Sequence, residues 1–327
     1  MITKTDASRK NDSQAGASCL AHFPIVIFAI IMGLSGLTLA FQTAGYVATG
    51  TVVLAITIML FLTFAAVYAF KALHHPEMVK AEWEHPVKLA FFPTISISTL
   101  LIATALGPIR PEVARVIWLL GALAQAGFTL SVIANWIGHR AFQPIHMSPA
   151  WFIPAVGNVI APLGGIGFGF NETSWVFFAG GLIFWLILLA LVFNRLVFHD
   201  PMPERMVPTL AILIAPPAVA FLAWMQLNGS QIDAMAHILY AAALVFFALA
   251  LTQVHKLLKL SFSLAWWALS FPLTALVAAT LRYGDLQNSP AHYAAGQLAL
   301  GAMCILIAGL ALRTIIAALR GQICVPE

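Results

Sequence analysis

The chain has 327 residues, of which 61% are hydrophobic and only 9% are charged, and its mean hydropathy is +0.93. A soluble protein of this composition would lack the polar residues needed to cover its surface, so the soluble globular classes are excluded. The formal net charge of +4 follows from the loop distribution of Lys and Arg described below and indicates no nucleic-acid partner.

The sequence opens with a polar stretch, residues 1–21, in which Lys4, Arg9 and Lys10 lie among Ser, Asn, Asp and Gln. The apolar run that follows is too long for the hydrophobic region of a signal peptide and has no small-residue cleavage site. We therefore expect a short cytoplasmic N-terminal tail, one membrane domain over residues 22–318 and a short cytoplasmic C-terminal tail over residues 319–327.

Apolar runs recur along the membrane domain, each close to the ~20 residues that a helix needs to cross a bilayer. They fall near 22–42, 47–71, 88–107, 113–137, 149–169, 174–197, 207–227, 234–255, 262–282 and 292–314. The connections between them are short, which makes consecutive helices antiparallel neighbours. The sequence predicts an all-α integral membrane protein with ten transmembrane helices in five helical hairpins.

Proline separates these spans into two sets, because each odd-numbered run contains it and the even-numbered runs do not. A proline removes a backbone hydrogen bond and kinks a helix, which is tolerable in a membrane only where protein or water can satisfy the freed groups. We expect the odd spans to form an inner ring around a central pore and the even spans to face lipid. The expected kinks are at Pro24, Pro93, Pro154, Pro216 and Pro272.

The basic residues fix the expected orientation. With a cytoplasmic N-terminus, 13 Lys and Arg residues fall in cytoplasmic segments, while only Arg110, Arg115 and Arg282 fall outside. This bias follows the positive-inside rule and predicts a multi-pass protein of the bacterial inner membrane with both termini in the cytoplasm.

Residues that could carry chemistry inside the membrane are few. Asp, Glu, Lys and Arg all lie at span ends or in loops, and intramembrane ionisable groups are the usual mark of proton relays and coupling-ion sites. The ten histidines are also peripheral, and Cys19, Cys304 and Cys324 have no metal-ligand spacing. We expect no metal, haem or other cofactor and no catalytic residue.

A pore without charges must be lined by hydroxyls, amides, small residues and backbone. The candidate pore-lining residues on the odd spans are Thr94, Ser96, Asn158, Ser270 and Thr274. No carboxylate is available in the spans, whereas basic residues crowd the cytoplasmic mouth, so an anion is favoured over a cation. Lys88, at the start of the third span, is the candidate vestibule residue.

The sharpest local motif is Trp266-Trp267-Ala268-Leu269-Ser270-Phe271-Pro272, which places a large aromatic beside a kink. Together with Phe23-Pro24, His85-Pro86-Val87-Lys88, Pro154-Ala155-Val156-Gly157-Asn158 and Ile214-Ala215-Pro216-Pro217, it resembles the tellurite-resistance/dicarboxylate transporter family. This family includes the TehA-type bacterial proteins and the slow anion channels of plant guard cells. The ordered set of motifs covers about residues 20–320.

The resemblance implies quasi-fivefold symmetry around one pore per subunit, a homotrimer, and occlusion of the pore by the aromatic of the ninth span, here Phe271. Ala29 and Gly33 of the first span would face this gate. Family members tend to carry glycine opposite the gate, often followed by a further proline. Ala29 would therefore crowd the ring by a methyl group, and Ile31 would remove a kink. A tightly closed resting state is expected.

The sequence therefore predicts a passive channel for small monovalent anions such as chloride and nitrate. A proton-coupled carrier of C4-dicarboxylate, sulfite or tellurite-related anions is the alternative, since histidines such as His22 or His237 at the mouths could couple transport to protons. A membrane enzyme or redox subunit is a second alternative, which would show a bound cofactor.

Overall fold

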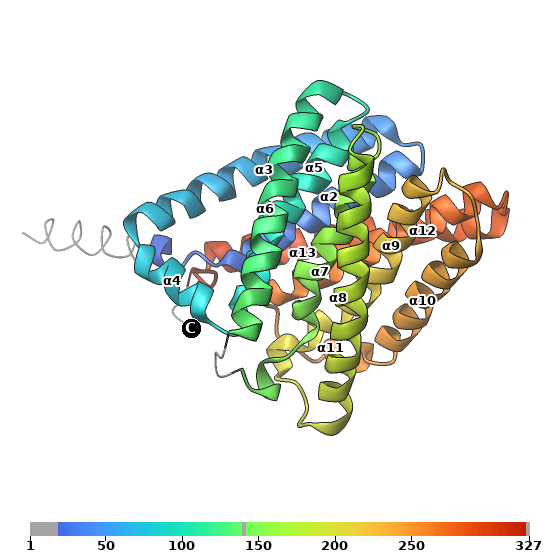
Figure 1. The fold of residues 1–327 in the computed structure, drawn as a ribbon. Helices are drawn as coiled ribbons and strands as arrows, with labels where there is room; N and C mark the ends of the chain where they lie inside the picture. Colours follow the sequence, from blue (N-terminus) through green and yellow to red (C-terminus); the bar gives the residue numbers. More distant parts are fainter. Residues whose placement is uncertain (1–18, 139–141, 325–327) are drawn as a thin grey trace, which may run out of the picture.

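The computed structural model describes residues 19–138 and 142–324, and within them the regular secondary structure is helical (Figure 1). Most of the predicted N-terminal tail, with Lys4, Arg9 and Lys10, lies outside the described residues, as do Arg140 and the last three residues of the C-terminal tail. Short helices occupy three of the connections: α4 (Pro76–Glu84), η3 (Pro144–His146) and α11 (Val254–Leu257).

Five long and continuous helices, called the outer helices below, correspond to the even-numbered spans. They are α3 (Val47–His74), α6 (Pro111–Ile137), α8 (Asn171–Phe198), α10 (Ala234–Leu251) and α13 (Pro290–Leu319). Only 17–33% of the most apolar 18-residue stretch of each outer helix is buried. The exposed residues are largely Leu, Ile, Val and Phe. In water such a surface would be unstable, so these faces are suited to lipid or to another subunit.

The odd-numbered spans, called the inner spans below, are built differently. Each has a 3-10 segment followed by an α-helix: η1 (Ile25–Ile27) and α2 (Phe28–Thr43), η2 (Lys88–Phe91) and α5 (Thr94–Leu106), η4 (Pro149–Trp151) and α7 (Phe152–Gly165), η5 (Glu204–Ile214) and α9 (Ala215–Leu227), η6 (Leu264–Leu269) and α12 (Ser270–Leu286). The predicted kinks take this form because a 3-10 turn bonds residues three apart and so absorbs the backbone disruption near a proline.

The expected prolines lie near these changes of helix type. Pro93 is the N-cap of α5, Pro216 lies in the first turn of α9, and Pro154 and Pro272 are the third residues of their helices. Pro24 precedes η1. In the first turn of an α-helix the missing proline N–H has no intrahelical partner to lose, so these helices start at proline with little cost.

Contacts between elements close the inner helices into a ring in the order α2, α5, α7, α9, α12 and back to α2. Each outer helix packs against the inner helix of its own hairpin and also against the next inner helix in this order, as α3 does with α2 and α5. The inner spans that qualify as membrane spans are 67–78% buried, which confirms the expected division into buried and exposed spans (Figure 1).

Nine helices in the described part of the chain are long and apolar enough to cross a membrane. The missing span is the fifth, because α7 has only 14 residues and its 3-10 extension is short. The predicted count of ten stays a prediction. One expectation needs correction: α6 and α13 begin with Pro111 and Pro290, so proline is not confined to the inner spans, but at the first helical position it leaves both helices continuous.

A buried ion pair fixes the entry of the chain into the first inner span. Lys71 Nζ lies 2.8 Å from Glu82 Oε2 and also donates to the carbonyl oxygen of Phe23, while the Tyr68 hydroxyl donates to the same carboxylate oxygen. Lys71 is 1% exposed and Glu82 is 7% exposed. Lys71 lies at the end of a predicted span and Glu82 lies in a predicted loop, as expected for charged residues. The burial of these two side chains was not predicted. Such a pair is costly to break from one side only.

We expect Lys71→Met to lower the stability of the folded protein by about 3–5 kcal/mol, because it leaves the Glu82 carboxylate buried without its cation. The loss should be smaller in the double variant Lys71→Met/Glu82→Gln. Thermal unfolding of the detergent-solubilised protein measures both. Lys80→Met, which breaks an exposed pair with Glu84, is the control, and its effect should be about 0–1 kcal/mol. Equal losses in the single and double variants would contradict the ion-pair interpretation.

Close packing of α8 on α7 depends on Gly181, since an added Cβ would lie 2.4 Å from Val159 Cγ2 and 3.1 Å from the carbonyl oxygen of Ala155. The neighbouring Gly180 has open space at the same position. We expect Gly181→Ala to force the two helices apart and cost about 1–3 kcal/mol. Gly180→Ala should leave the unfolding temperature unchanged or raise it. The reverse order in thermal unfolding would show that this contact does not limit stability.

Candidate functional site

A small cavity, called the central cavity below, lies where the inner spans meet. All five contribute to its wall, through residues such as Met32, Thr94, Ile153, Ile212 and Phe271. The segments that supply these residues are widely separated in the sequence and are brought together by the ring of inner helices. The central cavity is therefore a product of the whole ring and not of one hairpin.

The wall of the central cavity is almost entirely apolar, and none of the described residues that line it is titratable. Thr94 supplies the one hydroxyl among them, and its Oγ1 donates to the carbonyl oxygen of Phe91. An ion in this space would find backbone dipoles and polarisable side chains but no fixed charge. Such a wall can let an ion pass and holds it only weakly.

The α-helices of the inner spans begin at this cavity. Ala29, Thr94, Ile153, Ala215 and Phe271 are each the first or second residue of their helix, and each lines the cavity. A helix N-terminus carries a partial positive charge. The preceding 3-10 turn satisfies some of the N–H groups, as where Phe28 donates to the carbonyl oxygen of Ile25. The positive charge at these junctions is therefore smaller than at a free helix end.

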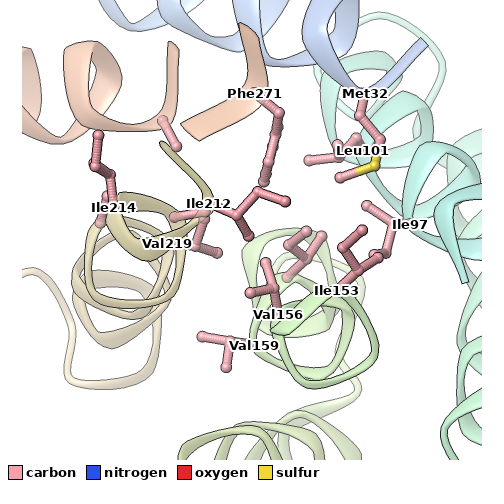
Figure 2. Packing of buried hydrophobic residues seen from close by; sticks show 14 of the residues in the cluster. Met32, Ile97, Leu101, Ile153, Val156, Val159, Ile212, Ile214, Val219 and Phe271 are labelled. Carbon is pink, nitrogen blue, oxygen red and sulfur yellow. The ribbon is translucent and has the colours of Figure 1, made fainter. Parts of the chain in front are cut away.

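Phe271, the predicted gate, extends from the start of α12 into the space between Ile212 and Met32 (Figure 2). Its side chain is 5% exposed. Hydrogen bonds fix the backbone on both sides: Ser270 Oγ donates to the carbonyl oxygen of Trp267, and Thr274 Oγ1 donates to that of Phe271. Trp267 Nε1 donates to Thr314 Oγ1 on α13, which anchors η6 to its outer helix. The ring is therefore held on a well-braced turn.

The first inner span approaches α12 through glycine. Ala29 lines the central cavity as expected for a residue facing the gate. A Cβ at Gly33 would lie 2.1 Å from Ser270 Oγ, so Gly33 contacts the turn before the gate. A Cβ at Gly36 would lie 3.2 Å from Phe271 Cδ2, so Gly36 is the glycine beside the ring. Sequence reasoning missed Gly36, although small residues spaced three apart on one helix face are a signal of close packing.

Ser96 and Asn158, predicted to line the pore, belong instead to a buried network around Gln125 of α6. Ser96 Oγ donates to Gln125 Oε1 at 2.7 Å, and Gln125 Nε2 donates to the carbonyl oxygen of Pro154 at 3.0 Å. Asn158 Nδ2 donates to the same carbonyl at 3.0 Å. The network joins α5, α6 and α7 and satisfies polar groups that lipid could not. Gln125, a mid-span amide on an outer helix, was the sequence signal for it.

The Pro154-Ala155-Val156-Gly157-Asn158 motif thus serves both sides of α7. Val156 lines the central cavity, whereas Gly157 leaves room for Gln125, whose atoms would lie 2.2–2.5 Å from a Cβ there. Ser270 and Thr274 are fully buried against α2. Of the five candidate pore-lining residues, Thr94 is the one placed at the central cavity, and the other four lie in helix contacts.

Lys88 begins η2, one turn before the cavity-lining residue Phe91. Its backbone N–H and that of Val87 both lie within hydrogen-bonding distance of His85 Nδ1, at 3.3 and 3.2 Å. The residue therefore stands at the end of the inner ring where the 3-10 segments are, and its role as a vestibule residue stays a prediction.

Comparison with known proteins finds a matching family and several relatives. Residues 22–315 match the family model described as SLAC1, voltage-dependent anion channel. The chain is 28% identical over 284 residues to the S-type anion channel SLAH3 of Arabidopsis thaliana, covering 83% of this chain and 44% of that protein. It is also 28% identical over 264 residues to the tellurite resistance protein TehA homolog of Haemophilus influenzae, covering 77% and 79%.

The chain spans about half the length of the plant channels that it matches, which include SLAH2 of the same plant at 27% identity, with 53% of that protein covered. The matched region covers the described inner spans and outer helices, with the exception of the last residues of α13. The resemblance seen in the sequence motifs is confirmed: the chain belongs to the SLAC1 family of voltage-dependent anion channels, which also holds the TehA homolog.

Proposed function

We propose that this protein is a passive channel for small monovalent anions such as chloride and nitrate, with its pore along the axis of the inner ring. The observation that carries the proposal is the central cavity, which is framed by the N-terminal ends of five α-helices and has no titratable lining residue. Positive helix ends favour an anion, and an uncharged wall releases it again. The names of the plant relatives, S-type anion channels, support the same conclusion.

This chemistry favours a channel over a proton-coupled carrier. A carrier coupled to protons needs a group that changes its protonation state in contact with the transported ion. The buried ion pair of Lys71 and Glu82 lies among α3, α4 and the start of η1, and neither residue lines the central cavity. Conduction down the gradient of the anion is the simpler use of this site.

The pore is closed by Phe271 in this proposal, since its ring occupies the space between opposite walls of the central cavity (Figure 2). An apolar ring in a narrow apolar space blocks an ion by its volume and by excluding water. Ala29, in the first turn of α2, adds a methyl group to the same wall and favours the closed state.

In the proposed assembly, ten helices in five hairpins repeat around the pore with quasi-fivefold symmetry, and η4 with α7 is the tenth span. The closed order of contacts among the inner helices supports this arrangement. A homotrimer in the bacterial inner membrane, with one pore per subunit and both termini in the cytoplasm, would bury part of the exposed apolar surface of the outer helices. The excess of Lys and Arg on one side supports the orientation.

Phe271→Ala should raise anion current through the purified protein in planar bilayers at least tenfold, because it removes the ring from the narrowest part of the central cavity. Under a chloride or nitrate gradient the current should reverse at the equilibrium potential of the anion. Phe193→Ala, which removes a ring from the outer helix α8, is the control and should leave the current unchanged.

The proposal fails if wild type and Phe271→Ala are both silent while liposomes take up anion only with an imposed proton gradient. That outcome would establish the coupled carrier of dicarboxylate, sulfite or tellurite-related anions instead. A current that is enlarged in the variant but reverses at the cation equilibrium potential would retain the gate and refute the anion selectivity.

Lys88→Gln should lower the anion conductance at low ionic strength, because a cation at the mouth raises the local concentration of anions. The effect should disappear near 1 M salt, where the screening length falls to about 3 Å. Lys80→Gln, on the exposed helix α4, is the matched control. An equal loss at low and high salt would show that Lys88 acts through structure and not through its charge.

A further inference from the structure

A second cavity lies on the opposite side of α12 from the central cavity and is called the lateral cavity below. Leu269 and Leu273 of the η6–α12 segment line it, while Phe271 between them lines the central cavity. Residues two apart on a helix point about 200° apart, so the two cavities face opposite sides of the gate segment. Nothing in the proposed conduction path uses the lateral cavity.

The outer helix beside the lateral cavity is short. α10 has 18 residues, whereas the other outer helices have 27–30. α10 ends at Leu251, and the hydroxyl of the next residue, Thr252, donates a hydrogen bond to the carbonyl oxygen of Leu249. The chain then continues into the single turn of α11. Most of η5 is buried, whereas its lining residue Leu210 is partly exposed, as are Leu269 and Leu273.

The wall of the lateral cavity is aliphatic and aromatic, with Gln253 as its polar member. Leu251 on the wall is 52% exposed, and Leu258 just beyond α11 is 73% exposed. An apolar wall with exposed leucines at its edge suits a hydrocarbon chain.

Three basic residues lie next to lining residues of the lateral cavity in the sequence. Lys256 lies on α11 between the lining residues Val254 and Leu257, and Lys259 follows one turn later. Arg205 is two residues before the lining residue Val207, and all three basic side chains belong to exposed residues. Glu204 is the acidic residue in the same segment. Basic residues next to an apolar groove at the end of a membrane helix match an anionic lipid headgroup.

We propose that the lateral cavity binds an anionic phospholipid, with one acyl chain against Leu269 and Leu273 and its headgroup on Lys256 and Lys259. The bound chain would lie behind the segment that carries Phe271. The site is independent of whether the central cavity conducts anions.

The test uses the full-length protein in nanodiscs of phosphatidylcholine that contain a phosphatidylglycerol with a diazirine in one acyl chain. After illumination, peptide mapping should find the adducts concentrated in segments 207–214 and 247–257. Unlabelled phosphatidylglycerol should compete, and phosphatidylcholine should not. Lys256→Gln/Lys259→Gln should weaken labelling roughly fivefold for each lysine removed.

Filling the lateral cavity provides a matched pair of variants. Ala250→Trp, at a lining residue, should abolish labelling, whereas Ala248→Trp, at an exposed position on the same helix, should not. The surface lysine variant tests the same site if Ala250→Trp fails to fold. The proposal is overturned if adducts spread evenly over the outer helices without response to these variants, or if phosphatidylcholine competes as well as phosphatidylglycerol.

Discussion

Each inner span contains a proline, which in a helix interior would cost a backbone hydrogen bond that hydrocarbon cannot replace. The structure meets this constraint by changing helix type near the proline, since a 3-10 segment precedes each inner α-helix. Four of the prolines lie at the start of the α-helix or within its first turn: Pro93, Pro154, Pro216 and Pro272. Burial follows, because these junctions must be surrounded by protein. The continuous outer helices can face lipid because their own backbone is fully bonded.

Burying five such spans against one another leaves little room for side chains. α2 meets α12 through Gly33 and Gly36, and α7 accommodates Gln125 through Gly157. The hydroxyls and amides of the inner spans are mostly used in these contacts, where Ser96 and Asn158 join the Gln125 network. Polar groups in a membrane interior therefore serve first to hold helices together. The central cavity is left with an apolar wall for the same reason.

In the proposed channel, an apolar cavity at the N-terminal ends of five α-helices would select an anion by field and by size and would not hold it tightly. A single ring such as Phe271 would then be sufficient to stop conduction. The lateral cavity lies on the other side of the same segment, against α10 and α11. The turn that carries Phe271 is thus bounded by the central cavity on one face and by the lateral cavity on the other.

The sequence by itself determined the membrane class, the spans to within a few residues in most cases, and the division into proline-bearing and continuous helices, because hydropathy and proline act locally along the chain. It also identified the family through motifs whose order is preserved. Only the tertiary structure decided which polar side chains meet the central cavity. Thr94 and Ser96 are two residues apart, yet one lines the cavity and the other bonds Gln125. The rotation of each helix about its axis makes that choice, and this rotation is set by packing between helices far apart in sequence.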